Sequence, residues 1–247
     1  MSEKSETVLR ADRLFKRFGS VTAVRDASFS VKAGTLLSLL GVNGAGKTTT
    51  IRMLTGLLKP DGGYAEICGY PIGSPEAARM IGLSPQETST AGNLTVRENL
   101  ILTAKLYGFR DAGRRADNII ERLGLNEYAN RRSKLLSGGL RRRLSIGMGI
   151  VTEPKVLFLD EPTLGLDILV RRELWRFIEE LKQTMTVVLT THYMEEAEHL
   201  SDRIAMMTDG TVTAEGTLAE LREISGCAPD SSLETVFIKF AEGGERK

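Results

Sequence analysis

Hydrophobic residues in the first third of the chain follow the two patterns that strands produce. Residues 8–14 and 23–31 are predicted strands, and in the second of these apolar residues alternate with polar ones at Ala27, Phe29 and Val31. Residues 36–40 form the continuous apolar run LLSLL, which is typical of a strand buried on both faces. A helix is predicted over residues 48–57 and, after a tight turn, a further strand over residues 64–68.

Residues 88–153 have a different, helical pattern. Thr95 and Glu98 form a capping box, and apolar residues then recur at helical spacing until Gly108. A second helix is predicted over residues 112–123, and a third begins just after residues 136–139. The pattern therefore predicts a block of helices inserted between strands.

Strand and helix alternate again after this block. The run at residues 156–160 predicts a buried strand, residues 170–181 carry one apolar helical face, and residues 186–190 predict the next strand. From about residue 216 the tail has the pattern of two short helices joined by a loop with Gly226 and Pro229. The alternation predicts an α/β fold with a mostly parallel sheet and a helical insertion.

Composition narrows the class of protein. The 247 residues carry a formal net charge of +1, which gives no global basic field of the kind that nucleic-acid-binding proteins show. The two cysteines lie far apart, so neither a disulfide framework nor a zinc site is indicated. Apolar runs fall short of the roughly 20 residues that a spanning helix needs. We therefore expect a soluble, cytoplasmic protein that meets a membrane only through a partner.

The segment GVNGAGKT at residues 41–48 matches the phosphate-binding loop G-x-x-x-x-G-K-[ST] between a predicted strand and a predicted helix. Its glycines let successive backbone N–H groups converge on phosphate oxygens, and the following helix directs its positive end at them. Lys47 adds a full charge for the β- and γ-phosphates, and Thr48 offers a hydroxyl ligand for Mg²⁺. The alternative is a glycine-rich turn with a surface lysine.

A second motif supplies carboxylates. The buried run at residues 156–160 ends in Asp160, which can hold Mg²⁺ through water beside the phosphate loop. Glu161 follows directly and can polarise an attacking water as a general base. A hydrophobic run that ends in Asp-Glu is common by itself, and the phosphate loop is what makes it informative.

Residues 137–139, Ser-Gly-Gly, offer another anion-binding helix start. Ser137 can cap the helix while the N–H groups of Gly138 and Gly139 face a phosphate. One ATP does not need two such termini from one chain, so the simplest use is the ATP of a second subunit. As an isolated tripeptide it would be an ordinary N-cap.

With these motifs in this order, the chain resembles the ATP-binding subunits of ABC transporters over about residues 8–240. The resemblance implies that Phe18 stacks on adenine, that Gln86 senses Mg²⁺ and the lytic water, and that His192 contacts the γ-phosphate. It also implies that Asp160 binds the metal and Glu161 is the catalytic base, that Asp167 lies at the dimer interface, and that Ser137 and Gly139 reach the γ-phosphate across the dimer.

The implied fold is a P-loop NTPase core with an N-terminal antiparallel β part and an inserted α-helical subdomain. The expected divisions of the single domain 1–247 are an ATP-binding core at 1–87 and 154–215, a helical subdomain at 88–153 and a helical tail at 216–247. The expected catalytic residues are Glu161, His192, Gln86 and Lys47, and the expected metal-binding residues are Thr48, Gln86 and Asp160. The residues expected to bind ATP are Phe18, Asn43, Gly44, Ala45, Gly46, Lys47, Thr48, Thr49, Ser137, Gly138 and Gly139.

Several of these residues have simpler explanations. Phe18 could be a core aromatic, Gln86 a solvated loop residue, and His192 a structural histidine. Other residues have no role in the resemblance. We expect Trp175 in the core and His199 on a helix surface, and residues 141–143, Arg-Arg-Arg, fit a solvated face better than a nucleic-acid patch because no aromatics are interleaved.

Three residues depart from the family pattern. Leu140 stands where Gln is usual, so a capping box with Ser137 is incomplete, at a cost of at most about 1 kcal/mol. Leu164 replaces a small hydroxyl residue, and Ile168 replaces a common proline. These two changes bear on the geometry of the dimer rather than on activity.

Finer resemblance, in residues 94–108, 191–210 and 232–240, is to ATPases of ABC-2 type export systems. It implies an ATP-hydrolysing subunit that dimerises, as a homodimer or a heterodimer, and powers export through a transmembrane permease subunit at the cytoplasmic face of the membrane. No nucleic-acid partner is expected. An ATPase of DNA repair or chromosome maintenance is an alternative, although no long heptad run occurs. A phosphate-loop GTPase is another, although no N-K-x-D or T-K-x-D motif is present.

Overall fold

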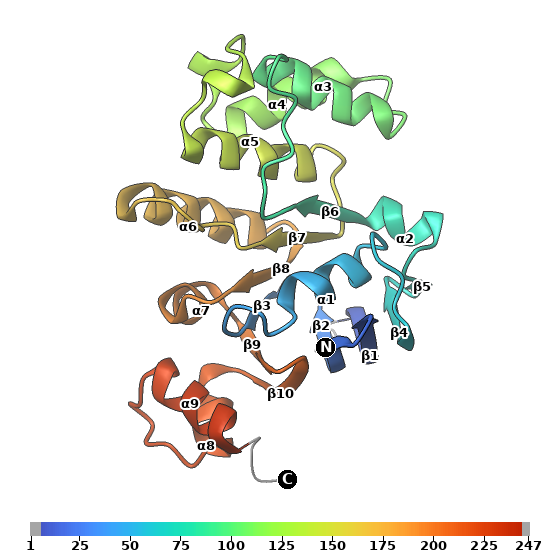
Figure 1. Ribbon diagram of the computed structural model, residues 1–247. Coiled ribbons are helices and arrows are strands. Elements are labelled where there is room, and N and C mark those ends of the chain that lie inside the picture. Colours follow the sequence, from blue (N-terminus) through green and yellow to red (C-terminus); the bar gives the residue numbers. More distant parts are fainter. Residues whose placement is uncertain (1–5, 244–247) are drawn as a thin grey trace, which may run out of the picture.

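The computed structural model describes residues 6–243, in which ten strands form a single sheet covered by helices (Figure 1). The strand order across the sheet is β5-β4-β1-β2-β10-β9-β3-β8-β7-β6. The strands are β1 (Thr7–Phe18), β2 (Val21–Lys32), β3 (Leu36–Leu40), β4 (Gly62–Ile67), β5 (Tyr70–Pro71), β6 (Ile81–Ser84), β7 (Val156–Asp160), β8 (Thr186–Thr191), β9 (Arg203–Thr208) and β10 (Thr211–Gly216). The α-helices are α1 (Lys47–Leu54), α2 (Pro75–Met80), α3 (Val96–Leu106), α4 (Ala112–Arg122), α5 (Gly138–Ile150), α6 (Ile168–Lys182), α7 (Met194–Leu200), α8 (Leu218–Ile224) and α9 (Leu233–Gly243).

The centre of the sheet is parallel. Strand β3 pairs with β8 on one side and β9 on the other, and β8 continues through β7 to β6, all in parallel register. Every residue of β3, β7 and β8 is buried, because helices cover both faces of the sheet. The predicted strands at residues 36–40, 156–160 and 186–190 are therefore confirmed.

The N-terminal part of the sheet is antiparallel, as expected. Strand β1 pairs with both β2 and β4, and β10 joins this part to the parallel part through a parallel pair with β2. The β9–β10 hairpin turns at Asp209 and Gly210, whose φ angles are 47° and 77°. The sequence analysis missed this hairpin, although Asp-Gly between two apolar runs is a strong signal for such a turn.

The helical subdomain lies beside the β6 edge of the sheet, where α3, α4 and α5 pack on one another (Figure 1). A close backbone approach fixes α5 on the sheet, because a Cβ atom at Gly82 of β6 would lie 2.0 Å from the carbonyl oxygen of Gly149. The capping box of Thr95 and Glu98 is present at the start of α3. Inside the subdomain, the buried Asn99 side chain bonds the backbone of Ala91, Leu94 and Thr95.

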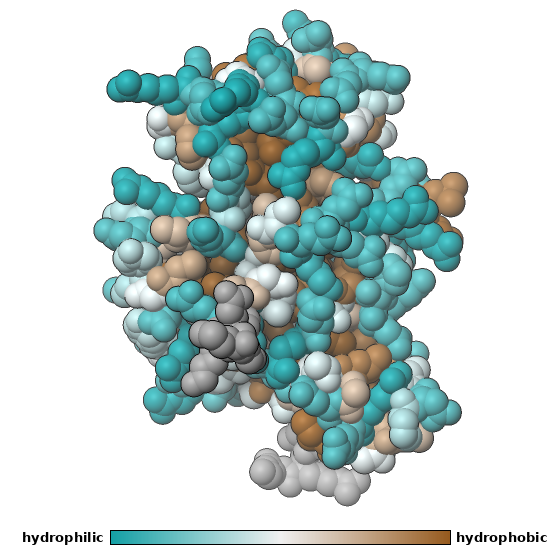
Figure 2. All heavy atoms as spheres, turned by 180° about the vertical axis from the view of Figure 1, so that it is seen from behind, coloured by the Kyte–Doolittle hydropathy of each residue, from teal (hydrophilic) through white to brown (hydrophobic). Residues whose placement is uncertain are grey.

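The tail consists of the two predicted helices. Helices α8 and α9 bury Leu221, Leu233 and Phe237 against the β9 side of the sheet, in a cluster with Leu40 and Met206. Seen from behind, hydrophilic side chains cover most of the molecule, and hydrophobic atoms show mainly in the depressions between them (Figure 2).

Two expectations need correction. Arg142 is not part of a solvated face, because it is only 5% exposed and donates to the carbonyl oxygens of Pro85 and Gln86. The helix expected over residues 48–57 ends at Leu54, since the chain leaves it at Gly56 with a φ of 74°. Trp175 is in the core and His199 is exposed, both as expected.

Candidate ATP-binding and hydrolysis site

The loop between β3 and α1 turns tightly at the start of the helix. Gly44 and Gly46 adopt φ angles of 85° and 103°, which side chains rarely tolerate. A Cβ atom at Gly46 would lie 2.5 Å from the carbonyl oxygen of Ala23, and one at Gly41 would lie 2.4 Å from that of Met207. The packing of the loop thus requires glycine at Gly41 and Gly46, whereas at Gly44 the φ angle is what favours it. No side chain caps α1, so its N-terminal N–H groups remain available to an anion.

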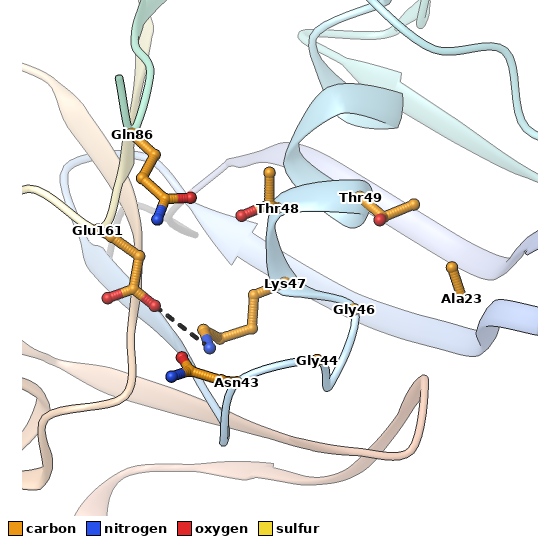
Figure 3. Close-up of a pocket in the computed structure, with 9 residues that line it drawn as sticks. All are labelled: Ala23, Asn43, Gly44, Gly46, Lys47, Thr48, Thr49, Gln86 and Glu161. Carbon is orange, nitrogen blue, oxygen red and sulfur yellow. Dashed lines mark ion pairs between the residues drawn. The ribbon is translucent and has the colours of Figure 1, made fainter. Parts of the chain in front are cut away.

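Lys47 extends back across this loop. Its Nζ donates to the carbonyl oxygens of Gly41 and Val42, at 2.7 and 3.1 Å, and forms an ion pair with Glu161 Oε1 at 3.2 Å (Figure 3). Its side chain is only 5% exposed. The alternative of a surface lysine on a glycine-rich turn is therefore wrong.

Asp160 ends β7 beside Thr48. The Thr48 hydroxyl donates to Asp160 Oδ1 at 3.0 Å, and the Thr190 hydroxyl of β8 donates to the same oxygen at 2.6 Å. Thr190 Oγ1 also accepts from the backbone N–H of Glu161 at 2.9 Å. The sequence analysis missed Thr190, whose only signal was its place at the end of a buried strand, where ligands of parallel sheets bind.

The Glu161 carboxylate lies between the side chains of Lys47 and His192. Its Oε2 is 2.8 Å from His192 Nδ1, while Oε1 is paired with Lys47. Its backbone has a φ of 47°, a conformation uncommon outside glycine, and the two hydrogen bonds to Thr190 hold it there. The carboxylate is therefore fixed in direction, which a general base requires.

Lys47, Thr48 and Glu161 line a pocket of about 350 Å³ (Figure 3). Its lining is Ala23, Asn43, Gly44, Gly46, Lys47, Thr48, Thr49, Gln86 and Glu161. Gln86 points into the pocket from the loop after β6, whose carbonyl oxygens at Pro85 and Gln86 are held by Arg142. The sequence offered no signal for that role of Arg142, because α5 and β6 meet only in the fold.

Other predicted site residues lie outside this lining. Phe18 is 50% exposed at the end of β1, with Lys16 Nζ at 5.6 Å from its ring centroid, so it is not a core aromatic. Ala45 is buried within the loop. Ser137, Gly138 and Gly139 begin α5 and do not line the pocket of this chain.

The start of α5 is nonetheless built as predicted. The Ser137 hydroxyl accepts from Leu140 N at 3.3 Å, which gives the N-cap without the reciprocal half of a capping box. Leu140 instead packs against the core cluster of the helical subdomain. Gly139 is required by α6, since a Cβ atom there would lie 2.5 Å from Val170 Cγ1.

A protein-only metal centre is absent from residues 6–243, in which no three His, Cys, Asp or Glu side chains group to hold an ion. The oxygen atoms of Thr48 and Asp160 are nevertheless of the type that Mg²⁺ prefers, and Mg²⁺ usually binds through one or two protein ligands together with substrate phosphates. The residues present therefore fit a metal that arrives with a nucleotide.

Comparison with known proteins identifies the class. The profile of the family described as "ABC transporter" matches residues 24–164. The chain is 41% identical to the linearmycin resistance ATP-binding protein LnrL of Bacillus subtilis, over 87% of this chain and 70% of that protein. It is 42% identical to the daunorubicin/doxorubicin resistance ATP-binding protein DrrA of Streptomyces peucetius, over 92% and 70%.

Solved structures of ABC ATP-binding subunits have the same fold as this chain. An ATP-binding subunit of an ABC transporter superposes with a TM-score of 0.85 and 29% identity, covering 95% of this chain and 99% of that chain. A dimeric ATP-binding cassette in a post-hydrolysis state, bound to ADP and Pi, superposes with a TM-score of 0.76 and 25% identity, covering 85% and 98%.

The chain therefore belongs to the ABC transporter family. It is an ATP-binding subunit of the ABC-2 export type, an ATPase whose hydrolysis of ATP drives transport. Subunits of this kind dimerise and work with a transmembrane permease subunit. The comparisons give no support to the DNA-repair alternative.

Proposed function

We propose that the pocket between the phosphate loop and Glu161 hydrolyses ATP with Glu161 as general base, and that the cargo of the transport is a drug or antibiotic. One observation supports the chemistry most strongly. The two oxygens of Glu161 are separately held by Lys47 and His192, directly beside the phosphate-binding loop. The cargo class is supported by the two relatives above, both of which are resistance proteins.

The phosphate loop, Lys47 and the residues around them have distinct parts in this proposal. Backbone N–H groups of residues 43–49 bind the phosphates, and Lys47 neutralises charge on the β- and γ-phosphates. Thr48 and Asp160 would hold Mg²⁺, which when bound neutralises developing charge on the phosphate oxygens. Glu161 takes the proton of the attacking water, and Gln86 orients that water.

ATP binding must rearrange the Lys47–Glu161 ion pair. Lys47 Nζ makes three contacts with its own chain, and at least the one with Glu161 has to weaken when the ammonium group turns to a phosphate. That change leaves Glu161 with His192 alone and free to accept a proton. The lysine thus restrains the base until nucleotide is present, which limits hydrolysis to a loaded site.

The second half of each ATP site would come from another subunit. Ser137, Gly138 and Gly139 form an anion-binding helix start that this chain's own pocket does not use. All the catalytic side chains are present in one chain, so we propose a homodimer with two competent sites. Phe18, half-exposed at the end of β1, would stack on adenine.

The permease subunit would contact the segment around Gln86. That segment also lines a second pocket of about 260 Å³ with Arg52, Leu57 and Ser89, between α1 and the loop after β6. No helix within residues 6–243 is long and apolar enough to cross a membrane. We therefore place the protein at the cytoplasmic face of the membrane, held there by its permease.

Transport into inverted membrane vesicles tests the proposal. Vesicles with the chain and its co-purifying permease should accumulate doxorubicin when ATP and Mg²⁺ are supplied, and vesicles with the Lys47→Met chain should not. Accumulation that is equal in both would contradict the ATPase role. ATP hydrolysis without accumulation of doxorubicin or linearmycin would contradict the cargo class alone.

A further inference from the structure

Three side chains stack in a row that ends at the catalytic pair. The guanidinium carbon of Arg171, on α6, lies 4.5 Å from the ring centroid of Tyr193. The Tyr193 ring in turn lies 4.1 Å from the His192 ring, centroid to centroid, with the planes tilted by 39°. Because His192 Nδ1 is 2.8 Å from Glu161 Oε2, the row links α6 to the carboxylate proposed as the base.

The Arg171 end of the row depends on the aromatic ring. The Nε atom of Arg171 is buried and has no hydrogen-bond partner among residues 6–243. The attraction between a guanidinium and the face of an aromatic ring offsets part of the cost of burying that atom. The ring of Tyr193 is therefore what accommodates the cation at this place.

Tyr193 occupies a position where another residue type would be expected. It is the N-cap of α7, where Ser, Thr, Asp and Asn are preferred, and its side chain makes no capping hydrogen bond. Its own N–H is instead held by Thr191 Oγ1 at 3.0 Å. Residues that break a local structural preference are found mainly at functional sites. The tyrosine at this N-cap therefore points to a role beside His192.

The first turn of α6, which precedes Arg171, is exposed on the surface of the molecule. Helix α6 starts after Asp167, whose carboxylate caps it, and its first residues Ile168 and Leu169 are 67% and 74% exposed. Arg171 N bonds the carbonyl oxygen of Asp167, so Arg171 moves with this turn. Two exposed aliphatic side chains on a capped turn form a surface suited to a second copy of the chain.

We propose that Tyr193 is a positioning residue that fixes the His192 ring against Glu161, and that Arg171 transmits the position of the first turn of α6 to it. This inference rests on the proposed role of the Glu161–His192 pair. A partner subunit that packs on Ile168 and Leu169 then adjusts the same pair through Arg171 and Tyr193. The consequence is that hydrolysis responds to dimer contact without a direct bond from the partner to His192.

The histidine signals of the chain allow a direct test. The chain has two histidines, and His199, whose ring lies 5.0 Å from that of Trp175, serves as an internal reference. In carbon–proton NMR spectra of the nucleotide-free, tag-free protein, Tyr193→Leu removes the ring over His192 and should shift its ring signals while those of His199 stay unchanged. Tyr193→Phe keeps the stack and should leave both in place.

Steady-state kinetics distinguish a role of Tyr193 and Arg171 in positioning His192 from a role in the stability of the fold alone. Tyr193→Leu and Arg171→Met should lower kcat on the order of 10–100-fold with little change in KM for ATP, because the base is misplaced but the phosphate loop is intact. Tyr193→Phe should restore kcat, and Arg176→Met, an exposed arginine on the same helix, is the matched control.

The two readouts fail in different ways. Unmoved His192 signals in Tyr193→Leu, or an unchanged kcat in both Tyr193→Leu and Arg171→Met, would overturn the inference while leaving the role of Glu161 intact. Wild-type turnover in Glu161→Gln would instead overturn the proposed function itself.

Discussion

Lys47 and Glu161 form an ion pair of 3.2 Å, Nζ to Oε1, in which the two side chains are only 5% and 6% exposed. The pair joins the phosphate loop to the end of β7, so the two motifs that the sequence placed more than a hundred residues apart meet at one contact. The same contact engages both the Lys47 ammonium group, which should bind phosphate, and the Glu161 carboxylate, which should activate water. In this structure the two side chains therefore restrain each other.

Removing the lysine should harm more than ATP binding. Lys47→Met leaves Glu161 buried with His192 as its remaining partner, and an uncompensated buried charge should lower the free energy of unfolding by up to about 3 kcal/mol. Lys47→Met combined with Glu161→Gln should recover part of that loss. Urea denaturation of the wild type, the two single variants and the double variant measures the coupling. Strict additivity would contradict the ion pair.

Thr190 holds both carboxylate residues, so its hydroxyl should matter more than its shape. Thr190→Val should cost about 1–3 kcal/mol of stability, because the N–H of Glu161 and one oxygen of Asp160 lose a buried partner. It should also lower kcat, since both side chains become less fixed. Thr190→Ser keeps the hydroxyl and is the control. Steady-state ATPase assays that show equal activity for Val and Ser would contradict this role.

Arg142 should act on the pocket through the Gln86 segment. Burial lowers the pKa of its guanidinium, while the charges of Asp160 and Glu196 oppose that shift. Arg142→Met removes the donors to the Pro85 and Gln86 carbonyl oxygens, so kcat should fall on the order of tenfold as the glutamine loses its place. Arg143→Met, which breaks only a surface pair with Glu173, should stay within about 1 kcal/mol of wild-type stability. ATPase rates and thermal melts of both variants provide the measurement.

Glu196 should make stability depend on pH. Burial raises the pKa of this carboxyl above 4.5 and the nearby Glu161 adds to the rise, against the hydrogen bond that Trp175 Nε1 donates at 3.0 Å. The folded chain therefore binds the proton more tightly than the unfolded chain. The stability that this provides is complete below pH 4.5 and is lost as the pH rises through the folded pKa.

Glu196→Gln mimics the protonated acid and does not titrate. Its stability relative to the wild type should thus improve as the pH is raised from 4.5 towards 8 in a series of urea titrations. Glu195→Gln makes the same change at an exposed neighbouring position and is the matched control. A constant difference between Glu196→Gln and the wild type across the series would contradict the raised pKa.

The sequence predicted the parts of the molecule that follow local rules. Continuous apolar runs predict buried strands such as residues 36–40 and 156–160. Glycines at fixed spacing predict the phosphate loop. Strands β9 and β10 were missed because neither of them alternates between buried and exposed residues. Arg142 was assigned to a solvated face because its partners, two carbonyl oxygens more than 50 residues away, are a product of tertiary packing.

The site follows the same division. Lys47, Asp160 and Glu161 could be named from motifs. The contact of Lys47 with Glu161 could not, because a motif specifies residue types and spacing and not which side chains meet in the fold. The roles of Thr190 and Tyr193 could not be predicted either, because they depend on contacts formed in the fold. Each acts through a neighbour, and such supporting residues carry no spacing of their own.

The Glu161→Gln variant, measured for ATP turnover and for ATP affinity in the same preparation, tests the proposed role of Glu161 most directly. Loss of the general base should lower turnover about 10²–10⁴-fold. ATP should meanwhile bind more tightly than to the wild type, because Lys47 no longer has to leave a charged partner, and the ATP-bound chain should sediment as a stable dimer. Turnover within a fewfold of the wild type would contradict Glu161 as the base. Weaker ATP binding would contradict the restrained Lys47–Glu161 pair.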